Sequence, residues 1–207
     1  MRKIKNILIP IDFSIASINA LKHGIEIAKI NQSDLHVIHS FRLIDSENTI
    51  NNNQAVELKT KLKSTLEKEL EALKETYAEN SGVNTFFNLH LGFPEDVIES
   101  ILLKQNMDII IMGSSGEGKS TNLLGSTLSS VVNFKNISIL ALSKEGSHTI
   151  PYQTILELFE QKDQFQIKDN NDSGLISIAN KDFEKLKKSL MEKPESEKIL
   201  NPIFIYC

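Results

Sequence analysis

Short apolar runs alternate along the chain with longer segments in which apolar residues recur every three or four positions. The first pattern is typical of strands buried in a sheet, and the second of amphipathic helices. One cycle is clear near the start, where an apolar run ends at Asp12 and is followed by Ile18, Leu21 and Ile25 at helical spacing. The same criteria predict strands at 4–11, 35–41, 83–91, 107–112 and 137–142, and helices at 18–28, 58–77, 94–102 and 124–134.

Strands that alternate with helices favour an α/β domain built on a parallel sheet with right-handed crossovers. We therefore predict a five-stranded parallel sheet with helices on both faces over residues 1–145. The run MDIIIM at 107–112 is the most continuous apolar strand, so it should lie in the middle of the sheet. Ligands of such sheets bind beyond the carboxyl ends of the strands.

The segment 146–207 predicts a second, truncated α/β unit with the order helix, strand, helix, strand. The strand-like GLISIA at 174–179 begins 66 positions after DIIIMG at 108–113, and PIFIY at 202–206 keeps that offset from the last strand of the first unit. We interpret the segment as a degenerate repeat of the domain's second half. An unrelated helical appendage with chance spacing is the alternative.

Composition and charge exclude several classes of function. The net charge of −4 and the mixing of lysine with glutamate give no basic field for nucleic acid. Apolar runs are too short for a signal peptide or a membrane span, so we expect a cytoplasmic protein with no membrane partner. The single cysteine, Cys207, cannot form an internal disulfide. His36 and His39 should lie on opposite faces of their strand, and we expect neither a metal site nor a catalytic residue.

The most informative loop follows the predicted central strand and leads into a helix. It contains Gly113, Gly116 and Gly118, which permit positive backbone φ and leave room for a ligand beside the main chain. Backbone N–H groups, neighbouring serines and the helix N-terminus would offer donors to an anion. The loop therefore predicts phosphate binding, although many glycine-serine loops are ordinary turns.

The same loop also fits a P-loop pattern, in which Gly113 is followed after four residues by Gly118, Lys119 and Ser120. A P-loop hydrolase needs a second strand that ends in an aspartate to hold magnesium, and the later predicted strands lack one. We find no general base. The enzyme interpretation is thus limited to a P-loop-like NTPase or slow hydrolysis of ATP.

Five stretches of the chain occur in a distinctive order: ILIPIDFS, ALKH, LHVIHS, GFPEDVIES and MDIIIMGSSG. In this combination the chain resembles the universal stress protein family over about residues 3–144. The resemblance implies a five-stranded parallel α/β fold and, in ATP-binding members, a loop that Gly113, Gly116, Gly125 and Ser126 would form here. It implies phosphate and ribose contacts by Gly113, Gly116, Gly125, Ser126 and Thr127, and an adenine end lined by Pro10, Asp12, Val37 and Met112.

Two features leave this nucleotide site open to alternatives. Eight residues separate Gly116 from Gly125 where the family usually has nine. A residue lost within the loop would shorten it, whereas one lost within the helix would rotate Gly125 by about 100°. Asp12 and Ser14 follow a strand, so either could cap the next helix instead of facing a nucleotide.

The resemblance implies that the chain binds ATP, with or without Mg²⁺, as a regulatory module in the stress response. The main alternative is a protein-interaction module of the same fold that binds no nucleotide. The second unit should bind none, because Ala179, Asp182, Met191 and Glu192 stand where the first has Gly113, Gly116, Gly125 and Ser126. Family domains commonly pair through their last strands, which implies either a homodimer or an addition of 202–206 to 137–142 within one chain.

Overall fold

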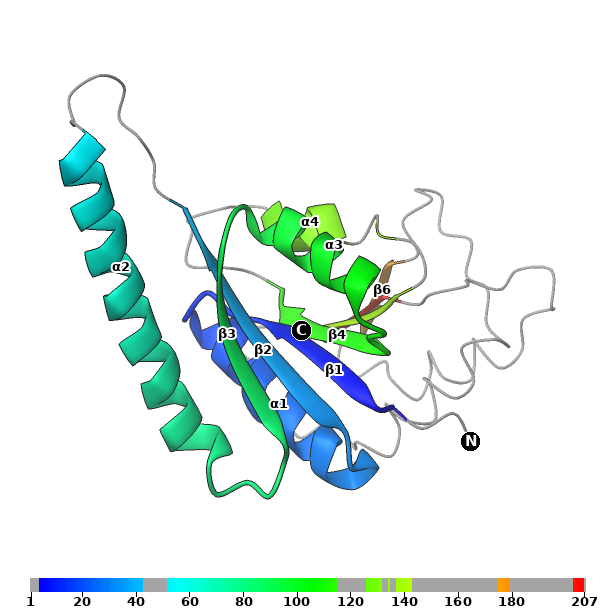
Figure 1. Ribbon diagram of the computed structural model, residues 1–207. Coiled ribbons are helices and arrows are strands. Elements are labelled where there is room, and N and C mark those ends of the chain that lie inside the picture. The colour runs from blue at the N-terminus through cyan, green and yellow to red at the C-terminus, as the bar shows by residue number, and fades with distance from the viewer. Residues whose placement is uncertain are drawn as a thin grey trace, which may run out of the picture.

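The computed structural model describes residues 4–42, 52–114, 126–131, 134, 137–142, 175–178 and 203–206. Seven parallel strands form one sheet in the order β3-β2-β1-β4-β5-β7-β6 (Figure 1). The strands are β1 (Asn6–Pro10), β2 (Asp34–Phe41), β3 (Thr85–Leu91), β4 (Ile109–Gly113), β5 (Ser138–Leu142), β6 (Leu175–Ile178) and β7 (Ile203–Tyr206). The helices are α1 (Ile15–Asn31), α2 (Asn52–Leu73), the π-helical turn η1 (Lys74–Ala78), α3 (Pro94–Lys104) and α4 (Ser126–Val131).

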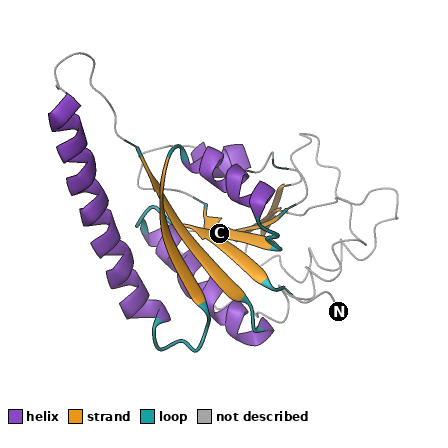
Figure 2. Ribbon diagram, viewed as in Figure 1, coloured by secondary structure: helices purple, strands orange, loops and turns teal. Residues whose placement is uncertain are grey.

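Strands β1 to β5 confirm the predicted five-stranded parallel α/β fold. The predicted central strand is β4, which pairs with β1 on one side and β5 on the other. Its residues Ile110 and Ile111 are fully buried, as expected for a strand covered on both faces. Figure 2 shows helices on both sides of this sheet.

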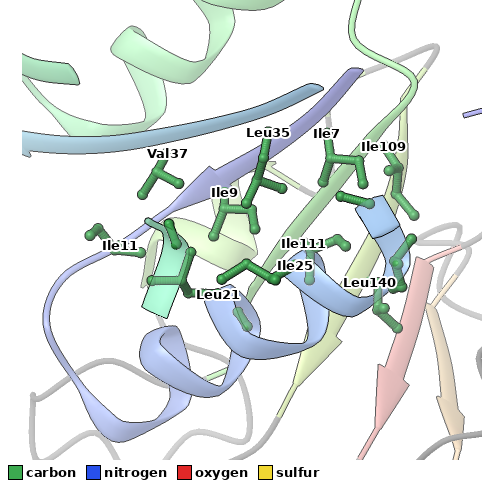
Figure 3. Close-up of a cluster of buried hydrophobic side chains, with 14 of the residues drawn as sticks. Ile7, Ile9, Ile11, Leu21, Ile25, Leu35, Val37, Ile109, Ile111 and Leu140 are labelled. Atoms are coloured by element: carbon green, nitrogen blue, oxygen red, sulfur yellow. The ribbon is translucent and has the colours of Figure 1, made fainter. Parts of the chain in front are cut away.

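Two separate cores hold the helices against the sheet. On one face α1 packs over β1 and β4, where Leu21 and Ile25 meet Ile9 and Ile111 (Figure 3). On the other face α3 and α4 cover a second cluster that contains Ile98, Leu128 and residues of β1, β4 and β5. Successive residues of β1 alternate between these cores, because side chains of a strand point to opposite faces.

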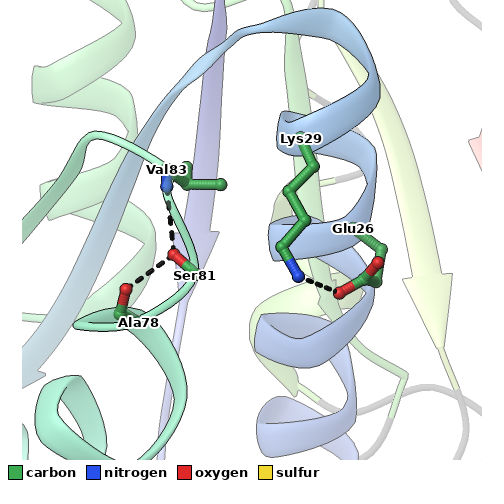
Figure 4. Close-up of polar contacts among 5 residues, drawn as sticks. All are labelled: Glu26, Lys29, Ala78, Ser81 and Val83. Atoms are coloured by element: carbon green, nitrogen blue, oxygen red, sulfur yellow. Dashed lines mark hydrogen bonds and ion pairs between the residues drawn. The ribbon is translucent and has the colours of Figure 1, made fainter.

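The turn between η1 and β3 is fixed by one serine. Ser81 Oγ donates to the carbonyl of Ala78 at 2.6 Å and accepts from the N–H of Val83 at 3.1 Å (Figure 4). Gly82 has a φ of 73°, which glycine adopts without steric cost. This turn separates the helical segment predicted at 58–77 from the strand predicted at 83–91. Figure 4 also shows the surface ion pair Glu26–Lys29 of α1, with N and O 2.7 Å apart.

The strand predicted at 202–206 adds to the predicted last strand of the domain within the same chain, since β7 pairs in parallel with β5. Strand β6 then pairs with β7. A constant offset of 66 would place Phe204 opposite Leu175, as Ser138 lies opposite Ile109, but Leu175 pairs with Ile203. The pairing is thus shifted by one residue from an ideal repeat. The two predicted helices of 146–207 lie outside the described residues, so the half-repeat stays a prediction.

Candidate functional site

The centre of the sheet contains the point at which the strand order reverses direction. From β1 the chain turns through α1 toward β2, whereas from β4 it continues through α4 toward β5 on the other side. Strands β1 and β4 are hydrogen-bonded neighbours, so their carboxyl ends at Pro10 and Gly113 lie side by side. Open α/β sheets bind ligands at this kind of switch point.

The loop from β1 to α1 holds an exposed carboxylate beside this switch point. Asp12 Oδ1 accepts a hydrogen bond from the N–H of Ser14 at 3.0 Å, and Asp12 is itself exposed. Ser14 is the N-cap of α1, and its Oγ accepts from the N–H of Ser17 at 3.2 Å. Of the two capping candidates that the sequence suggested, Ser14 is therefore the cap of α1, whereas Asp12 accepts the N–H of the cap residue itself. Because two N–H groups at this helix start already have partners, they are not free for a phosphate.

Phe13 gives the same loop an uncommon backbone conformation. Its φ is 63°, a left-handed value that few residues other than glycine adopt. The Phe13 ring lies against the His39 ring with centroids 4.6 Å apart, and His39 Nδ1 donates to the carbonyl of Ile11 at 2.8 Å. These contacts with β2 fix the loop on both sides of Asp12. Sequence reasoning missed Phe13 and His39, because their roles depend on contacts between different strands.

Gly113 has a structural reason to be glycine that does not involve a ligand. A Cβ atom at this position would lie 2.9 Å from the Cβ of Ala16 and 2.9 Å from the backbone N of Ser17. The first turn of α1 thus packs directly on the end of β4. The following residue, Ser114, is buried and donates its N–H to the carbonyl of Leu142 at 2.7 Å. The backbone at the start of the glycine loop is therefore fixed by contacts of Gly113 with α1 and of Ser114 with β5.

The structure brings some of the predicted site residues together and separates others. Pro10, Asp12 and Gly113 lie at the carboxyl ends of the two central strands or just beyond. Val37 is fully buried in the α1-side core, whereas Met112 is 4% exposed in the core of the opposite face, so their side chains do not share one surface. Ser126, which is exposed, and Thr127, which is half-buried, begin α4; Gly116 and Gly125 lie outside the described residues.

His36 and His39 belong to the same strand, β2, but contact different aromatic rings. His36 stacks on Phe86, with ring centroids 5.0 Å apart, while His39 contacts the α1-side residue Phe13. The prediction that His36 and His39 face opposite sides of the sheet is confirmed. Burial lowers the pKa of His36, against a weaker opposing effect of Asp34. In the described part of the chain, no cluster of three or more His, Cys, Asp or Glu residues could hold a metal ion.

Nor does any helix among the described residues have the length and apolar character needed to cross a membrane.

Comparisons with known proteins agree on the first part of the chain. The model of the universal stress protein family matches residues 3–142, which end with β5. A universal stress protein of Methanocaldococcus jannaschii is 32% identical over 145 residues, covering 68% of this chain and 82% of that protein. The solved structure of the hypothetical protein MJ0577 is 29% identical, with a TM-score of 0.61, and covers 70% of this chain and 99% of its own.

A more distant solved structure carries a ligand. It is a universal stress protein in complex with cAMP, is 15% identical with a TM-score of 0.53, and covers 69% of this chain and 99% of its own. At this identity the likeness concerns the fold.

Proposed function

This chain belongs to the universal stress protein family, and on that premise we propose that it is a nucleotide-binding regulatory module of the cytoplasmic stress response. One observation carries the proposal. At the switch point of the sheet, the ends of β1 and β4 lie side by side, with an exposed carboxylate on one loop and a glycine-rich loop on the other. A relative of the same fold binds cAMP, which supports a nucleotide as the ligand.

The two loops would bind different parts of the nucleotide. Phosphates fit the loop after β4 and the first residues of α4, where Gly116, Gly125, Ser126 and Thr127 would supply N–H and hydroxyl donors. The α1 start is unsuited to phosphate, because Asp12 adds a negative charge there and accepts the N–H of Ser14. We therefore propose that the Asp12 carboxylate binds a ribose hydroxyl of the nucleotide, or a Mg²⁺ ion that is bound together with ATP.

The adenine end would rest near the ends of the central strands. Pro10 is half-buried at the end of β1 and offers an apolar surface to a base. Val37 and Met112 would support this end from within the two cores instead of contacting the base with their side chains. A nucleotide bound between the two loops would stabilise their bound arrangement. Its binding free energy would then favour one conformation or assembly of the module.

Calorimetric titration of the nucleotide-free full chain with ATP and Mg²⁺ tests the proposal. Ser126→Asp places a carboxylate where phosphate should bind, while an aspartate in a first helical turn is compatible with the fold. Ser64→Asp, at an exposed position of α2, is the matched control. We expect micromolar binding in the wild type and the control, and a loss of at least about tenfold in Ser126→Asp, which corresponds to about 1.4 kcal/mol.

The alternative is a protein-interaction module without a nucleotide, and the spacing of eight residues between Gly116 and Gly125 favours it. It predicts no heat on titration and a melting temperature that excess ATP does not change. Equal affinity of the wild type and Ser126→Asp would instead contradict the assignment of phosphate to the start of α4.

A further inference from the structure

The described sheet ends in two different edges. One edge is β6, which has four residues, and the other is β3, which has seven. Strand β3 pairs only with β2 among the described strands, and Figure 1 shows it at the margin of the sheet, with α2 alongside. Its sequence, TFFNLHL, contains no Lys, Arg, Asp, Glu or Pro. Proteins normally protect long edge strands with charges, proline or bulges, so β3 is unusually open to pairing.

Two hydrogen bonds establish which residues of β3 face outward. The N–H of Leu35 donates to the carbonyl of Asn84, and the N–H of Gly92 donates to the carbonyl of Phe41. In a parallel strand the N–H and C=O of one residue point to the same neighbour, and successive residues alternate in direction. Even-numbered residues of β3 therefore bond to β2. The odd-numbered residues Thr85, Phe87, Leu89 and Leu91 direct their backbone groups to the open edge.

This arrangement is self-complementary about Asn88. If a second β3 lies antiparallel with Asn88 on the two-fold axis, Thr85 is opposite Leu91 and Phe87 is opposite Leu89. These are the outward-facing residues, so every outward N–H and C=O of the strand has a partner. A two-fold axis placed at Phe87 or Leu89 leaves some of these groups unpaired. We propose that β3 pairs with β3 of a second copy of this chain in this register, which joins two sheets across a two-fold axis.

The side chains of β3 agree with such a contact. Phe87 and Leu89 are half-buried against the α1-side core and would continue it into the partner. On the other face Phe86, which is 42% exposed, would lie opposite His90 of the second copy. Burial lowers the pKa of His90, and Lys104 lowers it further, which favours the neutral ring. The contact would thus place no like charges opposite one another at neutral pH.

Two substitutions oppose this pairing with little expected effect on the folded chain. Asn88→Lys brings two ammonium groups together on the two-fold axis, and Asn88 is exposed. Leu91→Pro removes an outward N–H at a residue that is 55% exposed, and proline is tolerated where an edge N–H faces solvent. Asn106→Lys, exposed in the loop between α3 and β4, is the matched control. Circular dichroism would verify that each variant is folded.

Sedimentation velocity of the full chain between about 1 and 100 µM gives the test. We expect a concentration-dependent dimer in the wild type and in Asn106→Lys, and about tenfold weaker association or more in Asn88→Lys and in Leu91→Pro. Hydrogen exchange at the amides of Phe87 and Leu89 should slow as concentration rises. A wild type that is monomeric throughout, or folded edge variants that dimerise as strongly as the control, would overturn the inference. This result is independent of nucleotide binding.

Discussion

Replacement of Gly113 by alanine should destabilise the folded chain even when no nucleotide is present. The added Cβ would lie 2.9 Å from the Cβ of Ala16, 2.9 Å from the N of Ser17 and 3.0 Å from the backbone carbon of Ala16. None of these atoms lies at the end of a flexible side chain, so α1 must move away from β4. Overpacking of a well-packed interior usually costs about 1–3 kcal/mol. The rigid neighbours here favour the upper part of that range, about 2–3 kcal/mol.

The assay is urea unfolding of the full chain, monitored by circular dichroism, and thermal unfolding is measured in parallel. For a chain of this size the expected loss corresponds to a decrease of about 4–12 °C in Tm. Ala16→Gly removes one of the three contacting atoms, so it should partly rescue Gly113→Ala in a double-mutant cycle. Gly82→Ala is the control, because it has open space but a positive φ, and it should lose about 1–2 kcal/mol with no coupling to Ala16→Gly.

A change of less than about 0.5 kcal/mol in the free energy of unfolding of Gly113→Ala, the range of an ordinary surface substitution, would contradict close packing of α1 on the end of β4. An absence of coupling with Ala16→Gly would also count against it. If the prediction holds, a substitution of Gly113 cannot serve as a clean test of phosphate binding, because it disturbs the packing of α1 in the absence of any ligand. Ser126→Asp avoids this difficulty.

Three further predictions concern other parts of the chain. Burial lowers the pKa values of His36 and His90 below their ordinary value. Near pH 6 the unfolded chain therefore binds more protons at these two residues than the folded chain does. The free energy of unfolding should therefore decrease as the pH is lowered from about 7.5 to about 5.5. In urea titrations the double variant His36→Gln/His90→Gln should show a smaller dependence of this free energy on pH. Phe13→Gly should be about 1 kcal/mol more stable than Phe13→Ala in the same assay, because both lose the ring but only glycine relieves the positive φ. Deletion of 147–207 exposes the β5 edge and should promote association in light scattering, whereas unchanged association would contradict the role of β7 as a cover.

The fold could be predicted from the sequence because its signals are local. The apolar runs became β1 to β5, since burial on both faces of a parallel sheet leaves a clear pattern. The helix predicted at 58–77 became α2, which begins earlier at Asn52, and the turn η1. The tail strand 202–206 was also found, because its apolar residues match those of β5. Its register was not, since a shift of one residue depends on backbone geometry that no composition pattern records.

The candidate site was less predictable than the fold. The resemblance assigned Pro10, Asp12 and Gly113 to one nucleotide site, and the structure places them at the ends of adjacent strands or just beyond. The resemblance gave no warning that Gly113 is required for helix packing. It also grouped Val37 with Met112, whose side chains belong to cores on opposite faces. Such facts arise from contacts between segments far apart in the chain. They can be inferred only when the packing of the elements is known.

A nucleotide site at the switch point of the sheet can be tested by a map of amide chemical shifts in the ¹⁵N-labelled full chain during titration with ATP and Mg²⁺. We expect saturable shifts in two groups of amides, at Asp12 to Ser14 after β1 and at Gly113, Ser126 and Thr127 around the glycine loop, with only small shifts along β3. Shifts that cluster elsewhere, or a spectrum that saturating ATP leaves unchanged, would contradict a nucleotide site at the switch point of the sheet.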